Sequence, residues 1–529
     1  MIYISQHSHS IIMELKSFLF LVLSSLSTSF CSAQNGDPTF VYSVSIPDPA
    51  NHVYQMELST SGWDRDTILF MIPNWMPGYY QMMNYSDDIY NIIAEDEQGI
   101  ELPLYKVSNN SWQVWDVRNK AFSISYDIRT KRQFVANSYV DSLHAYIVPS
   151  NSFLYVEGHI NSPVSVKINK HSDWNNTVSG LELIQGDSSL YFAPDFDVLY
   201  DSPFLLGNLK ELPSFSVQGI EHRFVGYRMG TFNETLFINT LEKVVESAVN
   251  IIGDIPYEQY TFIGIGPGRG GIEHLNNTTI SFTGNRLDSQ EGMYSMMNFL
   301  AHEYFHHYNV KRIRPLELGP FDYNRGSRTN LLWVSEGLSV YYEYLIVRRA
   351  GLTGDSVLLS SFEQHINSYE NNPGKNYQSL VQASYNTWED GPFGNQGENR
   401  GKTISYYEKG PIIGLLLDLA IRHATQNEKS LDHVMQLLYW DYYKKKERGF
   451  TDAEFQQACE TVAGKSLSSL FEYVYTTKPI DYNTYLNFAG LELRSIEGDQ
   501  QTKNFIIERL PNPSPLQNNI LNSWLGKHD

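Results

Sequence analysis

Two different periods of apolar residues divide the chain. From Thr39 to about Tyr227, apolar and polar residues alternate in short runs such as Phe40–Ile46, Phe122–Ile128 and Val164–Ile168. An alternation with period two puts the apolar side chains on one face of a strand, and the Gly, Pro and Asn residues between the runs are typical of turns. The pattern predicts antiparallel strands packed as a β-sandwich.

The period changes near Gly230. In Leu236–Val249, apolar residues recur every three or four positions, which predicts an amphipathic helix. Helical spacing returns in residues 412–419, 431–442 and 452–463. The second half of the chain is therefore expected to be mostly helical.

These patterns predict an α+β multidomain protein. We expect an N-terminal antiparallel β-sandwich domain in residues 34–229, a mostly helical domain in residues 230–480, and a short C-terminal tail in residues 481–529. A length of 529 residues is consistent with two or three domains of ~150 residues each.

The first 33 residues have the pattern of a secretory signal peptide. Lys16 precedes the apolar run Phe18–Leu23, and small residues at Cys31–Ala33 offer a cleavage site. The apolar run is shorter than the ~20 residues of a membrane-spanning helix, and no later stretch qualifies. We expect an exported protein, periplasmic or secreted, cleaved near Ala33 and without a transmembrane segment in the mature chain.

Charge and cysteine content narrow the possible functions. The formal net charge of −20 argues against nucleic-acid binding, because neutralising phosphates needs a basic surface. Of the two cysteines, Cys31 and Cys459, only Cys459 would remain after cleavage, so no intramolecular disulfide is expected. The sequence leaves the oligomeric state open.

The stretch Ala301–Asn309 contains the pattern His-Glu-x-x-His. On a helix, positions i and i+4 share a face, so His302 and His306 can bind one zinc ion while Glu303 lies about 100° round the helix. Zinc with three protein ligands keeps one position for water and lowers the pKa of that water to ~7, so Glu303 can act as general base. The pattern predicts metal-assisted peptide hydrolysis with one zinc per chain; the alternative is a surface helix with two solvated histidines.

A third ligand is available downstream. Apolar and aromatic residues recur at helical spacing in Leu331–Glu343, and Glu336 lies in the first turns of this expected helix. Pro and Gly residues break the chain between His306 and Glu336 into a connection, so the two helices can pack with their ligand faces converging. We predict Glu336 as the third zinc ligand; the alternative is an exposed Glu favoured by the helix dipole.

A glycine-rich segment, Gly266–His274, formally contains Gly-x-Gly-x-x-Gly. A dinucleotide site needs a helix directly after this motif, whereas a β-like sequence, Leu275–Thr283, follows. We therefore reject a nucleotide site. We predict instead that Gly270 and Gly271 let a substrate backbone approach the strand edge, and that Glu273 pairs with the substrate's α-ammonium group.

The run His302–Pro315, followed by Trp333–Gly337, closely resembles the glycyl aminopeptidase family of gluzincin zinc metallopeptidases. The Asn-Val-Lys-Arg-Ile-Arg-Pro tail of this run is more specific than the zinc motif itself, although the family usually has Trp in place of Tyr308. Pro73–Tyr80 also resembles the Trp-x-Pro-Gly signature of the family's β-rich N-terminal domain. There we expect a rigid turn with packed aromatic residues and assign no chemistry.

The resemblance implies a thermolysin-like catalytic domain and further site residues. The family's Gly-Gly-x-Glu-His aligns Glu273 with the amine-binding Glu of related zinc aminopeptidases. Its Tyr-x-Lys-Gly aligns Tyr407 with a Tyr that donates a hydrogen bond to the tetrahedral oxyanion, where a preorganised phenol stabilises negative charge. Tyr406 is the alternative that only packs.

Two further expectations concern the end of the chain and a long loop. The family commonly adds a PDZ domain, for which the 49 residues after Ile480 are too few, so residues 481–529 are expected to be a PDZ remnant or a plain tail. Asn371–Lys402 is rich in Asn, Gly and Pro, and we expect it to border the substrate cleft.

Together these observations predict an exported zinc-dependent aminopeptidase that acts on peptides. The resemblance implies a preference for Gly or Ala as the first residue. A zinc endopeptidase using the same site is one alternative, against which the Glu273 carboxylate argues, since it poorly tolerates a continuing chain. A non-catalytic peptide-binding protein on a peptidase fold is the other, although such proteins usually lose a ligand or the base.

Overall fold

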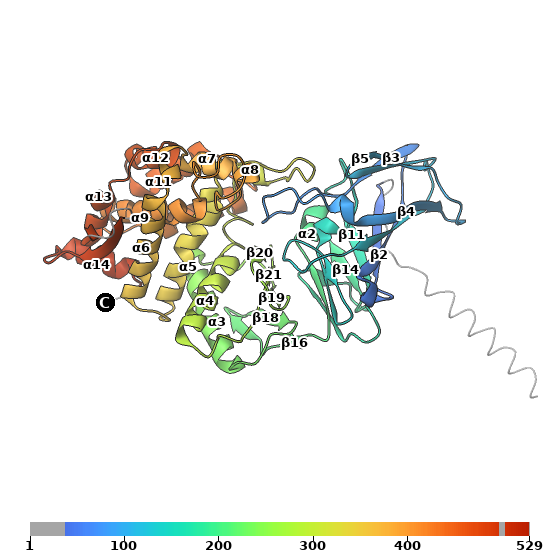
Figure 1. Ribbon diagram of the computed structural model, residues 1–529, viewed down its shortest axis with the longest axis horizontal. Helices are drawn as coiled ribbons and strands as arrows, with labels where there is room; N and C mark the ends of the chain where they lie inside the picture. The colour runs from blue at the N-terminus through green and yellow to red at the C-terminus, as the bar shows by residue number, and fades with distance from the viewer. Residues whose placement is uncertain (1–36, 497–502, 528–529) are drawn as a thin grey trace, which may run out of the picture.

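The computed structural model describes residues 37–496 and 503–527. A β-rich half and a helical half lie side by side along the long axis of the molecule (Figure 1). The predicted signal peptide lies outside the described residues. The order of the two halves confirms the predicted α+β fold class.

Strands dominate the first 170 or so described residues. They are β1 (Thr39–Ser45), β2 (Val53–Ser61), β3 (Thr67–Met71), β4 (Ile89–Asp96), β5 (Leu104–Ser108), β6 (Ser111–Trp115), β7 (Phe122–Arg129), β8 (Tyr139–Val140), β9 (His144–Ile147), β10 (Tyr155–Val156), β11 (Val164–Asn169), β12 (Asn176–Ser179), β13 (Glu182–Leu183), β14 (Leu190–Ala193) and β15 (Phe204–Gly207). One short helix, α2 (Phe196–Tyr200), interrupts them.

These strands form three sheets that share one core. The largest has the order β13-β14-β11-β1-β2-β7-β4, and two four-stranded sheets have the orders β10-β3-β6-β5 and β12-β15-β9-β8. Alternate residues of β2 and β7 are buried, as the period of two predicted. One pair departs from the expected antiparallel pattern: β1 lies parallel to β11, because the long chain between them crosses back to the same end of the sheet.

A further sheet begins before the predicted domain boundary. Its strands are β16 (Lys210–Glu211), β17 (Phe215–Val217), β18 (Ile220–Gly226), β19 (Gln259–Gly264), β20 (Gly271–Glu273) and β21 (Asn277–Ile280). The order is β16-β18-β19-β21-β20, with β17 paired to β18. Because β18 pairs with β19, the boundary predicted between residues 229 and 230 cuts this sheet, and strand pairing places the division between β15 and β16. Period-two alternation is common to both sheets and so does not mark the boundary.

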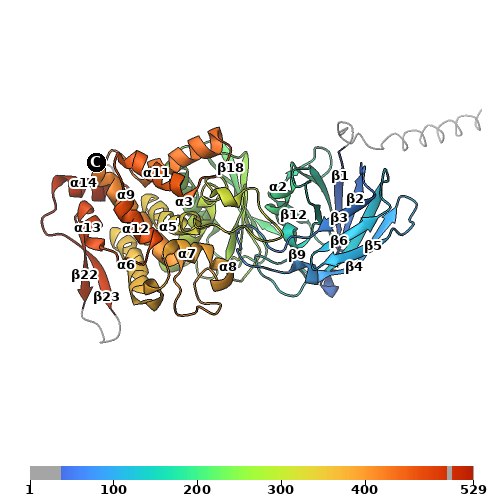
Figure 2. The ribbon, with the colours of Figure 1, turned by 90° about the horizontal axis from the view of Figure 1, so that it is seen from above.

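The helical half is built around α9, whose residues are almost all buried. The helices are α3 (Glu234–Ile252), α4 (Gln290–Phe305), α5 (Leu338–Arg349), α6 (Asp355–Asn371), α7 (Leu380–Tyr385), α8 (Thr387–Asp390), α9 (Tyr406–Ala424), α10 (Leu431–Leu437), α11 (Asp452–Ala463), α12 (Ser468–Tyr475), α13 (Tyr482–Leu486) and α14 (Pro515–Trp524). Viewed from above, α5, α6 and α9 form the middle of this half (Figure 2). None of the helices described by the structure has both the length and the hydropathy of a membrane span.

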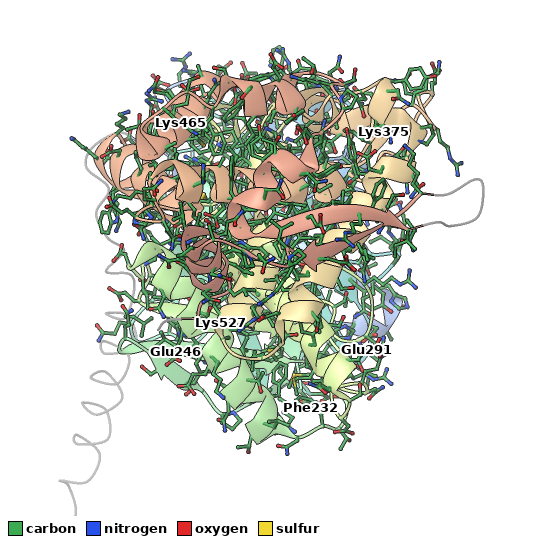
Figure 3. The ribbon with its side chains drawn as sticks, turned by 90° about the vertical axis from the view of Figure 1, so that its left-hand side faces the viewer. Phe232, Glu246, Glu291, Lys375, Lys465 and Lys527 are labelled. Atoms are coloured by element: carbon green, nitrogen blue, oxygen red, sulfur yellow. The ribbon has the colours of Figure 1, made fainter. Side chains whose placement is uncertain are left out.

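The C-terminal segment packs onto the helical half. A hairpin of β22 (Leu491–Ile496) and β23 (Asn504–Arg509) lies with α14 across the face of the helical half that is remote from the β-rich half (Figure 3). Trp524 is fully buried there, and its indole nitrogen donates a hydrogen bond of 3.0 Å to the hydroxyl of Tyr341. This segment therefore shares the hydrophobic core of the helical half.

Replacing Trp524 with Ala tests this packing. The substitution leaves a large cavity against Phe362 and removes the hydrogen bond to Tyr341, so we expect the free energy of unfolding to fall by about 3–5 kcal/mol. Trp440, which is 46% exposed, offers a matched control whose replacement with Ala should cost less than about 0.5 kcal/mol. Urea denaturation measures both, and equal effects would show that the segment is not part of the core.

Candidate active site

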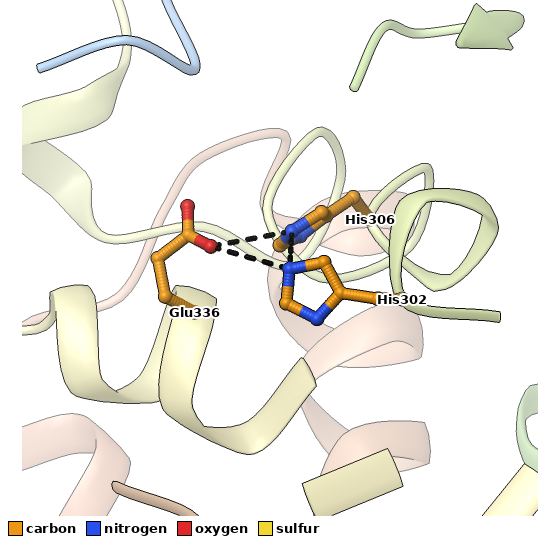
Figure 4. A group of neighbouring side chains, drawn as sticks. All are labelled: His302, His306 and Glu336. Atoms are coloured by element: carbon orange, nitrogen blue, oxygen red, sulfur yellow. Dashed lines mark hydrogen bonds and ion pairs between the residues drawn. The ribbon is translucent and has the colours of Figure 1, made fainter. Parts of the chain in front are cut away.

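Three side chains from two segments converge on one point (Figure 4). The Nε2 atoms of His302 and His306 lie 2.9 Å apart. The Oε2 atom of Glu336 lies 3.6 Å from the first and 3.3 Å from the second. The structure thus brings together the three residues predicted as metal ligands, and all are largely buried.

The oxygen atom that lies beside Nδ1 of each imidazole favours one tautomer. His306 Nδ1 donates to the carbonyl oxygen of Asn309 at 2.7 Å, and His302 Nδ1 lies 2.9 Å from a carboxylate oxygen of Glu343. With both protons on Nδ1, both Nε2 lone pairs face the carboxylate of Glu336. Three electron-pair donors with no proton between them repel one another unless a cation lies among them. Two imidazoles and one carboxylate are a ligand set that suits zinc.

Helix α4 carries both histidines and determines their spacing. It begins at the capping residue Ser289, whose hydroxyl accepts a hydrogen bond from a backbone N–H of the first turn. His306 follows the last helical residue but keeps helical backbone angles, so it still lies one turn beyond His302. His307 does not point at the metal ligands, and its Nδ1 donates a hydrogen bond to the carbonyl oxygen of Tyr304. This position is consistent with a structural role for His307.

Glu336 lies on a π-helical turn, Trp333–Gly337, that leads into α5, and not on a regular α-helical turn. A close glycine contact places this turn against α9: a Cβ on Gly337 would lie 2.6 Å from the Cα of Gly410. Both glycines belong to the motifs noted in the sequence. Their contact allows the start of α9, with Tyr407, to approach Glu336.

Asn309 joins the two ligand-bearing segments. Its side-chain amide donates hydrogen bonds to the carbonyl oxygens of Val334 (2.8 Å) and Ser335 (3.1 Å), while its own carbonyl oxygen accepts the bond from His306. Asn309 is fully buried, and loss of its side-chain amide would remove this link to the turn that carries Glu336. These hydrogen bonds give a structural reason for an Asn at this position of the Asn-Val-Lys-Arg-Ile-Arg-Pro motif.

Arg312, also in this tail, holds the loop that follows β20. Its guanidinium donates to the carbonyl oxygen of Leu275 (2.9 Å), to the side chain of Asn276 (3.0 Å) and to the carbonyl oxygen of His307 (2.8 Å). The planar fork of an arginine suits several fixed acceptors at once. The tail therefore links the end of α4 to the loop between β20 and β21.

Tyr407 is placed next to the ligand cluster. Its hydroxyl donates a hydrogen bond of 2.9 Å to Oε2 of Glu336. Burial, and then the charge of Glu336, raise the pKa of Tyr407 well above its usual value, so the phenol keeps its proton. Tyr406 is buried and shares a hydrogen bond with the hydroxyl of Thr387, as the packing role would require.

Glu303 is buried against the glycine-rich strand. A Cβ on Gly271 would overlap its carboxylate, so this glycine makes room for Glu303. Burial raises the pKa of Glu303 to about 7, although His302 and His306 act in the opposite direction. The carboxylate of Glu336 differs: burial raises its pKa, but the two histidines outweigh this effect and hold it well below its usual range.

Glu273 ends the edge strand β20 and is only 4% exposed. Its Oε1 atom has no hydrogen-bond partner within the described part of the chain. The side chain lines a small cavity of about 210 Å³, and Gly78 and Tyr80 line both this cavity and the cleft at the metal ligands. A buried carboxylate without a partner is costly, and a cationic group is the partner that it suits.

The metal-ligand cluster opens into a cleft of about 1200 Å³ between the two halves of the molecule. Gly270 and Gly271 lie on its wall at the free edge of β20. The loop after α8 also borders it, and the ring of Phe393 stacks on that of Tyr407 at 5.4 Å. Part of the region 371–402 thus lines the cleft, as expected, while the rest forms α7 and α8.

Two family models match the chain. Residues 41–208 match the Peptidase M61 N-terminal domain, and residues 295–413 match the M61 glycyl aminopeptidase. The two models describe parts of one family and together match more than half of the chain. The chain belongs to the M61 glycyl aminopeptidase family. This M61 chain is a peptidase, and the family resemblance seen in the sequence is confirmed.

Solved structures share the fold of this M61 peptidase. An aminopeptidase N family protein from Idiomarina loihiensis superposes with a TM-score of 0.81 at 24% identity, covering 88% of this chain and 82% of that one. An M1 zinc metallopeptidase from Deinococcus radiodurans has a TM-score of 0.52 at 13% identity, covering 85% and 96%. An aminopeptidase A from Legionella pneumophila has 0.51 at 13%, covering 84% and 50%. A comparison with curated sequences found no match.

The sequence did not identify Glu343 as a site residue of the M61 peptidase. Its contact with Nδ1 of His302 orients the imidazole and favours the tautomer that presents Nε2 to a metal. One signal was available: Glu343 follows Glu336 by seven residues, which is two helical turns, so both carboxylates fall on one face.

The sequence also missed Asp201, which lies at the end of α2 in the β-rich half. Its carboxylate binds Nδ1 of His274 (3.0 Å), the backbone N–H of Leu275 (2.6 Å) and the ammonium of Lys311 (2.7 Å). These partners directly follow Glu273 or belong to the tail of the zinc motif. The N-terminal half of the M61 peptidase therefore holds the segment that follows Glu273. No local sequence pattern indicates this contact.

Replacing Asn309 with Asp tests the link between the two ligand segments. The substitution keeps the shape but puts a carboxylate oxygen against the carbonyls of Val334 and Ser335. We expect zinc affinity, measured by competition with a chromogenic chelator, to fall about 10–100-fold, as for other groups that orient ligands.

Asn110 offers the control, because its buried amide also donates to a backbone carbonyl oxygen, that of Ile72 at 2.9 Å, but it lies in the N-terminal half and does not line the cleft. Asn110→Asp should leave zinc affinity within about twofold of the wild-type value, as expected for a site that is independent of the ligands. If both variants bind zinc as the wild type does, Asn309 does not hold the site together.

Proposed function

We propose that this M61 peptidase is an exported, zinc-dependent aminopeptidase that removes N-terminal Gly or Ala from peptides. The proposal rests on one arrangement of side chains: the lone pairs of His302, His306 and Glu336 converge beside the buried Glu303. Glu273, whose Oε1 atom has no hydrogen-bond partner among the described residues, lies nearby. Export rests on the pattern of residues 1–33, and the preference for small residues rests on the family resemblance.

His302, His306 and Glu336 would hold the metal. When bound there, zinc supplies a Lewis acid and lowers the pKa of a coordinated water to ~7. Glu303 takes a proton from the attacking water onto its carboxylate and passes it to the leaving nitrogen. Its position against Gly271 allows this, because the side chain is held at the wall of the cleft and away from bulk solvent.

Tyr407 acts on the carbonyl oxygen of the scissile bond. Negative charge develops on this oxygen as the tetrahedral intermediate forms, and a phenol that keeps its proton can donate a hydrogen bond to it. The phenol already points at the ligand cluster, where it donates to Glu336. It therefore needs little movement to reach a substrate oxygen at the same place.

Glu273 binds the substrate's α-ammonium group. The carboxylate lines a small cavity that shares Gly78 and Tyr80 with the cleft, and the turn at Gly78 lies directly against it, which leaves little space for a peptide chain to continue past this point. This arrangement disfavours the endopeptidase alternative. The non-catalytic alternative is disfavoured because the ligands, Glu303 and Tyr407 are all present in one cleft.

Blocking the amino terminus of a substrate tests the proposal. Wild-type enzyme should hydrolyse Gly-Ala-Ala-Ala, and N-acetylation should lower kcat/KM at least 100-fold because an acetylated nitrogen carries no charge for Glu273 to bind. Equal rates on both peptides would favour the endopeptidase, and zinc binding without turnover of either would favour the non-catalytic protein.

A Glu303→Gln variant, measured on the same peptide, assigns this activity to the site. It should bind one zinc per chain and lose about 10²–10⁴-fold in kcat, the usual contribution of a general base. Glu291→Gln, on an exposed part of the same cleft, is the matched control and should keep its kcat. A Glu303→Gln enzyme with full zinc and full activity would contradict the mechanism.

A further inference from the structure

We propose that Gly78 and Tyr80, on a turn of the N-terminal half, close the cleft beside Glu273 and so restrict the first residue of the substrate to Gly or Ala. The inference rests on the proposed aminopeptidase function. From the sequence alone, this turn was expected to be rigid and was assigned no chemistry.

The turn is anchored firmly in the helical half of the molecule. Trp75 is fully buried, and its indole nitrogen donates a hydrogen bond of 2.7 Å to the carbonyl oxygen of Asp322. Its ring packs edge-to-face on that of Trp388 at 5.1 Å. The side-chain amide of Asn74 donates to the carbonyl oxygen of Asn324 at 3.0 Å. A wall supported in this way yields little to a bulky substrate.

Gly78 brings this turn into direct contact with the strand that carries Glu273. A Cβ on Gly78 would lie 2.8 Å from Oε2 of Glu273 and 3.0 Å from Cγ2 of Ile272. The φ angle of Gly78 is +89°, a region that other residues rarely adopt. The backbone of the turn therefore lies flush against β20, with no space between them for a side chain.

Tyr80 lines both the large cleft at the ligand cluster and the small cavity that Glu273 lines, and it is only 7% exposed. Burial, and then the charges of Glu336 and Glu273, raise the pKa of its phenol well above the usual value, which agrees with a position near both carboxylates. Its ring faces those of Trp75 and Trp388, at 6.3 and 6.4 Å, and cannot easily retreat.

The first residue of a bound peptide is held at both ends. Its ammonium binds Glu273 and its carbonyl lies beside Tyr407, and two backbone bonds of ~1.5 Å each separate these groups. The residue therefore cannot slide along the cleft to make room for its own side chain. A hydrogen or a methyl group fits beside Tyr80, whereas a Leu or Phe side chain must displace this ring or pull the ammonium away from Glu273.

The size preference can be measured directly. For wild-type enzyme, kcat/KM should fall from Gly and Ala to Leu and Phe p-nitroanilides. Tyr80→Ala should raise the ratio of kcat/KM for the Leu substrate to that for the Gly substrate at least ~10-fold, the scale on which pockets discriminate side chains. Tyr80→Phe keeps the ring and should keep the wild-type ratio, and so should Tyr105→Ala, an exposed tyrosine of the same half.

Each outcome bears on one proposal. A wild-type enzyme that accepts Leu as readily as Gly, or a zinc-loaded Tyr80→Ala enzyme that keeps the wild-type ratio, overturns the inference while leaving the aminopeptidase intact. A wild-type protein that cleaves none of the substrates overturns the proposed function. If Tyr80→Ala does not fold, Tyr80→Leu, which keeps an apolar side chain, takes its place with the same expected direction.

Discussion

Asn309 links the two ligand-bearing segments on which the whole site depends. Its backbone carbonyl oxygen accepts a hydrogen bond from His306, and its side-chain amide donates to the π-helical turn that carries Glu336. A long connection separates the two segments in sequence, and their ligands repel one another. A rigid hydrogen-bond network in a low-dielectric interior, together with the packing of Phe305 on α4 against Tyr342 on α5, can hold these ligands close to one another.

The site is shared by both halves of the molecule. The helical half supplies the three metal-ligand side chains, and the sheet formed by β16 to β21 supplies the edge strand with Glu273. The N-terminal half contributes Asp201, which fixes the residues after Glu273, and the turn at Gly78, which touches its carboxylate. The contact between the halves therefore determines the position of the group proposed to recognise the substrate, and the N-terminal half is more than a support.

Local spacing explains which features the sequence could predict. The i and i+4 histidines, the helix around Glu336 and the alternating strands follow from periodicities within short windows, and the structure has them where they were expected. The boundary predicted between residues 229 and 230 falls within one sheet, and period alone could not show this because strands on both sides share the same period. Gly78, Tyr80 and Asp201 were not identified as site residues, since their partners lie far away in sequence and no local pattern marks such contacts.

A crystal structure of the zinc-loaded protein, with anomalous scattering recorded at the zinc edge, would test the metal centre most directly. We expect one ion per chain, bound by the Nε2 atoms of His302 and His306 and by the carboxylate of Glu336, with one remaining position open to water. An ion bound elsewhere, or one whose fourth position is filled by a protein side chain, would contradict the proposed chemistry.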